Sequence, residues 1–131
     1  MITEEQIHLE LVERVRLTNA RTLFWHTPNS GLLAPQYRRK VLALGMLPGV
    51  PDLLFFTPPK ILREVVVIDP HDAVLRVPYV GAALELKSDD GTLKDSQRDV
   101  LDQLHELGWT TAVTYGLDAG IAKLREWGYI R

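Results

Sequence analysis

The sequence contains no cysteine, which excludes a disulfide framework and a thiolate metal site. It also lacks an apolar run close to the roughly 20 residues that a membrane-spanning helix needs. Its first residues are polar and helix-like, whereas a secretory signal has a basic start followed by an apolar stretch. We therefore expect a cytoplasmic protein with no membrane partner.

An excess of positive charge is missing as well. The chain has 15 Lys and Arg against 17 Asp and Glu, for a formal net charge of −2. Such a balance argues against a protein that coats DNA through a broad basic surface. It argues less against a nuclease, because metal-binding carboxylates lower the total. The 131 residues are 46% hydrophobic and show no repeat or linker, so one globular domain spanning 1–131 is expected.

Charged residues lie in two segments that are otherwise typical of buried strands. Asp52 opens the apolar run Leu53-Leu54-Phe55-Phe56 and follows Gly49-Val50-Pro51. Glu85 and Lys87 alternate with leucines, so their side chains project from the same face of a strand. Burying two carboxylates and an amine is costly unless they pair or bind an ion. Mg²⁺ prefers oxygen ligands and keeps several waters, so Asp52 and Glu85 indicate a metal site. Lys87 beside it would orient or deprotonate an attacking water.

The first helix is expected from Thr3 to about Thr18, with Thr3 as its N-cap and an inward stripe at Ile7, Leu11, Val12 and Val15. Glu4 and His8 lie on the same side as Leu11 and Val15. Glu4 has two interpretations, an exposed first-turn glutamate or a carboxylate that reaches the site from the end of the helix.

A strand is expected over 22–27, followed by a turn at 28–31. His26 in this strand is either a structural histidine or a base or ligand. Arg38, Arg39 and Lys40 form a cationic run ahead of the acidic site. They are either phosphate contacts or the solvated face of a helix.

The segment 65–77 predicts a β-hairpin with Pro70 in its turn. Turn chemistry explains Asp69, His71 and Asp72 better than a second metal site does. A helix follows from about Lys94 to Leu107, with its buried stripe expected at Val100, Leu101, Leu104 and Leu107.

Gln97 lies on the inward face of that helix and needs a polar partner there. The Asp52, Glu85 and Lys87 cluster is the available candidate. A strand over 110–115 and a closing helix over 117–127 complete the expected elements.

Taken together, Gly49-Val50-Pro51-Asp52, Glu85-Leu86-Lys87 and Gln97 resemble the VRR-NUC domain of the PD-(D/E)XK nuclease superfamily. The resemblance extends to the helix opening at Glu4, to Pro28-Asn29 and to Gly91-x-Leu93. It covers most of the chain except 57–79. VRR-NUC domains occur alone in phages and bacteria, and at the end of the Fanconi-associated nuclease.

The resemblance implies an α/β fold with a central mixed sheet flanked by helices, a restriction-endonuclease-like core, to which the hairpin at 65–77 would be added. It implies endonucleolytic cleavage of DNA, possibly branched, that depends on Mg²⁺ or Mn²⁺. Asp52, Glu85 and the backbone carbonyl of Leu86 would bind the metal, with Glu4 as an added carboxylate. Lys87 would act on the water and Gln97 would support the site. Asn29 would join the cationic run in contacting DNA, and a homodimer is implied.

The sequence departs from the family pattern at His8, at Lys94 and in the longer segment between Asp52 and Glu85. Two other function classes remain open. One is a non-catalytic module that binds DNA structures, and the other is a partner protein with a purely structural charged cluster. Both classes are disfavoured, because the sequence retains all four of the residues Asp52, Glu85, Lys87 and Gln97.

Overall fold

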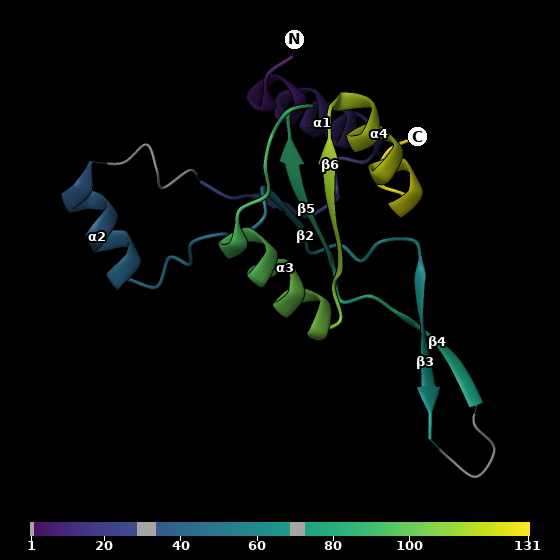
Figure 1. Cartoon of the computed structure of the whole chain (residues 1–131). Coiled ribbons are helices and arrows are strands. Elements are labelled where there is room, and N and C mark those ends of the chain that lie inside the picture. The colour runs from purple at the N-terminus through teal and green to yellow at the C-terminus, as the bar shows by residue number, and fades with distance from the viewer. Residues whose placement is uncertain (1, 29–33, 69–72) are drawn as a thin grey trace.

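The computed structural model describes residues 2–28, 34–68 and 73–131 (Figure 1). Asn29 and the turn residues Asp69, Pro70, His71 and Asp72 lie outside these ranges. The elements in chain order are α1 (Glu4–Thr18), β1 (Phe24–His26), α2 (Pro35–Ala43), β2 (Leu53–Phe55), β3 (Leu62–Val67), β4 (Ala73–Pro78), β5 (Ala82–Lys87), α3 (Asp95–Glu106), β6 (Thr110–Tyr115) and α4 (Leu117–Trp127). Within the described ranges, no helix is both long and apolar enough to traverse a lipid bilayer.

The main sheet has four strands in the order β1-β2-β5-β6. The β1–β2 and β2–β5 pairs are antiparallel, and β5–β6 is parallel. α3 makes the crossover between the two parallel strands, as such a connection requires. The mixed α/β architecture expected from the sequence is therefore confirmed.

β5 is one of the two inner strands of the sheet, and all six of its residues are buried. Its leucines face a core built from α1 and α4, where Leu11 and Leu124 are fully buried. Its opposite face carries Glu85 and Lys87 and is approached by Gln97 of α3. The core face is apolar and the other face carries the charges, so the alternation expected for this strand is confirmed.

Local sequence explains how the site elements begin. Thr3 caps α1 in a capping box, in which its hydroxyl accepts from Gln6 N and its own N–H donates to Gln6 Oε1 at 2.8 Å. Gly49 has φ +87°, and a Cβ there would lie 2.4 Å from the carbonyl oxygen of Ser96. Only glycine lets this loop approach the start of α3 so closely.

Two elements project from the body in Figure 1. α2 has no buried residue, and the hairpin formed by β3 and β4 is a separate two-stranded sheet. The hairpin was predicted at 65–77, and its strands span a longer segment, 62–67 and 73–78.

Several expected bounds are wrong by a few residues. The strand expected over 22–27 spans 24–26, and the apolar run after Asp52 leaves the sheet before Phe56, which is 46% exposed. Leu107 was expected in the buried stripe of the third helix but is 70% exposed. Its position caps the end of α3, where the chain turns at Gly108 with φ +96°, so it no longer follows the helical periodicity.

Candidate active site

A cavity of about 780 Å³ opens where the start of α1, the end of β1, the loop before β2, the end of β5 and the start of α3 meet, and α2 contributes one side chain to it. Titratable and amide side chains from all of these elements line it. They include Glu4, His8, His26, Arg38, Asp52, Glu85, Lys87, Lys94 and Gln97. Residues that are up to 93 positions apart in the chain, counting from Glu4 to Gln97, therefore share one cavity.

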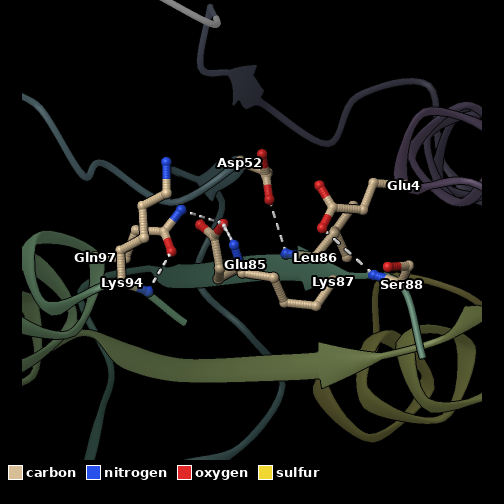
Figure 2. Close-up of polar contacts among 8 residues, drawn as sticks. All are labelled: Glu4, Asp52, Glu85, Leu86, Lys87, Ser88, Lys94 and Gln97. Carbon is tan, nitrogen blue, oxygen red and sulfur yellow. Dashed lines mark hydrogen bonds and ion pairs between the residues drawn. The ribbon is translucent and has the colours of Figure 1, made fainter. Parts of the chain in front are cut away.

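Asp52 is held at the cavity by the end of the β-ladder. Before Leu53 the chain no longer pairs with β5, and Pro51 has no N–H to offer to the ladder. The Asp52 carboxylate replaces the missing backbone acceptor, because its Oδ2 accepts from the backbone N–H of Leu86 at 2.7 Å (Figure 2). Asp52 thus gives the N–H of Leu86 an acceptor and lines the cavity from the same position.

Glu85 is the buried centre of the polar cluster. Its side chain is 4% exposed, and its Oε1 lies 3.4 Å from Lys87 Nζ. The same Oε1 accepts from Gln97 Nε2 at 3.0 Å, while Gln97 Oε1 accepts from the backbone N–H of Lys94 at 2.9 Å (Figure 2). Gln97 therefore finds the polar partner that its inward position required.

The surroundings disfavour a negative charge on Glu85. Burial, followed by the charge of Asp52, raises the pKa of Glu85 from 4.5 to about 8, although Lys87 opposes the shift. The single positive charge of Lys87 does not balance the two negative charges that Asp52 and Glu85 would carry in this pocket. A bound divalent cation would favour the ionised form of both.

This shift predicts how stability depends on pH without metal. A carboxyl whose pKa is raised on folding stabilises the folded state below its unfolded value, and that contribution is lost as the pH rises to about 8. Between pH 7 and 8 the free energy of unfolding should fall by about 1 kcal/mol, then level off. Urea titrations of the metal-free protein measure this, with Glu85→Gln as the control. An equally steep fall in the control would contradict the assignment to Glu85.

Glu4 lies at the cavity, whereas only one residue of the basic run at 38–40 does. Glu4 is exposed, as a first-turn glutamate would be, and it also lines the cavity, where its Oε1 accepts from the backbone N–H of Ser88 at 3.4 Å. Its role as a site carboxylate stays a prediction. Arg38 also lines the cavity, whereas Arg39 and Lys40 are exposed elsewhere on α2 and are absent from the lining. Asn29 lies outside the described residues.

Two histidines, His8 and His26, also line the cavity. From the sequence, His26 was either a structural histidine or a base or ligand, and His8 had no assigned role. The rings of His8 and His26 meet edge to face with centroids 4.5 Å apart. Burial, then the neighbouring His26, lowers the pKa of His8, and Asp52 opposes this. The spacing of His8 four residues after Glu4 placed it on the correct helix face, but nothing local showed that β1 would bring His26 beside it.

The donor set fits a hard divalent cation. Asp52 and Glu85 offer carboxylate oxygens beside a cavity large enough for waters, and Mg²⁺ is typically held by one or two carboxylates with waters completing its shell. In the described part of the chain, no group of three His, Cys, Asp or Glu side chains is close enough to hold a metal by itself. Water or backbone oxygens would have to supply the remaining ligands.

No family model matches this sequence, and neither does any curated protein. Among solved structures, the chain is similar to one described as a "VRR_NUC domain protein". The likeness has a TM-score of 0.70 and 18% sequence identity, and it covers 99% of this chain and 91% of that one. At this identity the comparison shows a shared fold, which is the fold that the sequence motifs had indicated.

Proposed function

We propose that this chain is a metal-dependent endonuclease of the VRR-NUC family that hydrolyses phosphodiester bonds in DNA. The observation that carries the proposal is the convergence of Asp52, Glu85, Lys87 and Gln97 in one cavity, on the fold of a VRR_NUC domain protein. Buried charges at this density are costly in a purely structural role. Branched or otherwise structured DNA, as formed in replication, repair and recombination, is the proposed substrate.

In this proposal Asp52, Glu85 and the backbone carbonyl of Leu86 hold Mg²⁺ or Mn²⁺, with Glu4 as a further carboxylate. The ion would polarise the phosphoryl oxygen and lower the pKa of a bound water. Lys87 Nζ, held 3.4 Å from Glu85, orients the attacking water or takes its proton. Gln97 fixes the Glu85 carboxylate through its 3.0 Å hydrogen bond, so that the carboxylate keeps one rotamer.

A cleavage panel tests the proposal. Supercoiled plasmid, linear duplex and a four-way junction are incubated with the protein in Mn²⁺, in Mg²⁺ and in chelator. We expect metal-dependent cutting, with the junction cut faster than the linear duplex. Binding of the junction without cutting in either metal would instead support a non-catalytic DNA-structure-binding module.

The hairpin supports a proposal about assembly. A two-stranded hairpin alone is at best marginally stable in water, yet this one pairs mainly within itself and exposes Val66 at 64% and Val74 at 57%. Its cross-strand pair of Glu64 and Arg76, 3.6 Å apart, leaves that face with no net charge. A neutral apolar face does not repel its own copy, so we assign it to a homodimer with two-fold symmetry.

The homodimer should therefore depend on this face. Replacing Val66 and Val74 together by threonine keeps β-branched residues in the strands and removes apolar contact area. We expect the parent to have the mass of a dimer in light scattering and the double variant to dissociate at lower concentrations. A monomeric parent at high micromolar concentration would rule out the assignment.

A further inference from the structure

The carboxylates that line the cavity would repel the phosphates of a bound DNA. Glu4, Asp52 and Glu85 all line it, and the chain as a whole has a net charge of −2. A DNA backbone that enters must therefore be held by local cations. Lys87 already lies against Glu85, which leaves Arg38 and Lys94 as the cavity-lining side chains available for this task.

Both side chains are exposed at the cavity. Among the residues that the structure describes, no carboxylate lies within ion-pair distance of Arg38 or Lys94. The next basic residue along the chain differs, because Arg98 in α3 pairs with Asp95 at 3.7 Å and does not line the cavity. Figure 2 shows the Lys94 side chain beside Gln97, extending toward the side of β5 where the Asp52 carboxylate lies.

Lys94 also occupies a position that suits lysine poorly. It is the N-cap of α3 and makes no side-chain cap hydrogen bond, whereas Ser, Thr, Asp and Asn stabilise that position by accepting from the first turn. A positive charge at a helix N-terminus is further disfavoured by the helix dipole. A residue that lowers local stability while lining the cavity points to a role in binding.

Resting on the proposed nuclease function, we infer that Lys94 and Arg38 are substrate-positioning residues that bind backbone phosphates of the DNA on either side of the cleaved bond. Lys94 reaches the cavity from the start of α3, beside Gln97 and Glu85. Arg38 reaches it from α2, an arm that contributes no residue to the core. The DNA strand would thus pass between α2 and α3, over the carboxylates of Glu4, Asp52 and Glu85.

The test uses Lys94→Ser and Arg38→Gln, with Arg98→Gln as the control that removes the same charge one helical turn from Lys94. Binding of a short fluorescein-labelled DNA duplex is followed by anisotropy in chelator, so that no cutting occurs. Lys94→Ser should raise the melting temperature by about 3 °C through the new cap. It should also weaken binding by about fivefold to tenfold at about 0.1 M salt, and lower the slope of log K against log salt by about 1.

Arg38→Gln should weaken binding and flatten the salt slope similarly, with no gain in stability because it creates no cap. In cleavage assays both variants should raise KM more than they lower kcat. Arg98→Gln should change binding by less than twofold.

Three outcomes would overturn the inference alone: binding by Lys94→Ser and Arg38→Gln that matches Arg98→Gln, an unchanged salt slope, or a lower melting temperature for Lys94→Ser. If the parent protein neither binds nor cuts DNA, the proposed nuclease function fails as well. The two failures are therefore distinguishable.

Discussion

Replacing Lys87 by alanine should lower the rate of DNA cleavage by about 10² to 10⁴, the usual range for loss of a group that acts on the attacking water. Lys87 is only 6% exposed, and its Nζ is 3.4 Å from Glu85 Oε1. Affinity for Mn²⁺ should change little, because the ammonium favours an ionised Glu85 but repels the metal, and these effects oppose each other.

The stem of Lys87 is also packed, since a Cβ on Gly91 would lie 3.1 Å from the Cβ of Lys87. Lys87→Met therefore serves as a second variant that keeps the stem and removes the charge. Single-turnover cleavage and calorimetric Mn²⁺ titration of both variants measure the two effects separately. Cleavage near the parent rate in Lys87→Met would show that the lysine is a structural counter-ion.

Replacing Asp52 by asparagine should abolish cleavage without destabilising the metal-free protein. Asp52 and Glu85 are like charges in a largely buried pocket, and their proximity contributes to the raised pKa of Glu85. Asparagine removes one charge and still offers an oxygen to the N–H of Leu86, which Asp52 accepts at 2.7 Å. The metal-free variant should melt at the parent temperature or above it.

Metal binding should then change the melting temperatures of the parent and of Asp52→Asn by different amounts. A ligand that binds only the folded state stabilises it by about 2.7 kcal/mol at one hundred times its dissociation constant. Mn²⁺ should raise the melting temperature of the parent, and that of Asp52→Asn far less. Asp52→Ala is the matched control, since it also removes the acceptor for Leu86 N–H and should melt lower. If Asp52→Asn melts lower than the parent without metal and still cuts DNA, Asp52 is a structural residue.

The strand carrying Glu85 and Lys87 was predictable because its alternation is strict and its charges are few. The same holds for Gln97, whose spacing before Val100 and Leu101 placed it on the inward face of a helix. The hydrogen bond between Asp52 and Leu86 joins residues 34 positions apart. It follows from the order of strands in the sheet, which local patterns do not encode.

Other features escaped sequence reasoning for the same physical reason. The run at 38–40 was interpreted either as phosphate contacts or as the solvated face of a helix. A helix spreads neighbouring residues around its axis, and Arg38 lines the cavity while Arg39 and Lys40 do not. Lys94 departs from the family pattern in the sequence, and only the fold placed it at the same cavity as Asp52. Leu107 followed the periodicity of its helix in the sequence, yet the helix ends before it.

The most direct test of a metal-dependent phosphodiesterase centre at Asp52 and Glu85 is nicking of supercoiled plasmid by the parent and by Asp52→Asn, prepared in parallel. We expect the parent to convert plasmid to nicked and linear forms in Mn²⁺ and to leave it unchanged in chelator. We expect Asp52→Asn to leave the plasmid intact under both conditions while it still retards a DNA junction in a gel. Equal nicking by the two proteins, or nicking that persists in chelator, would contradict a metal-dependent centre at Asp52 and Glu85.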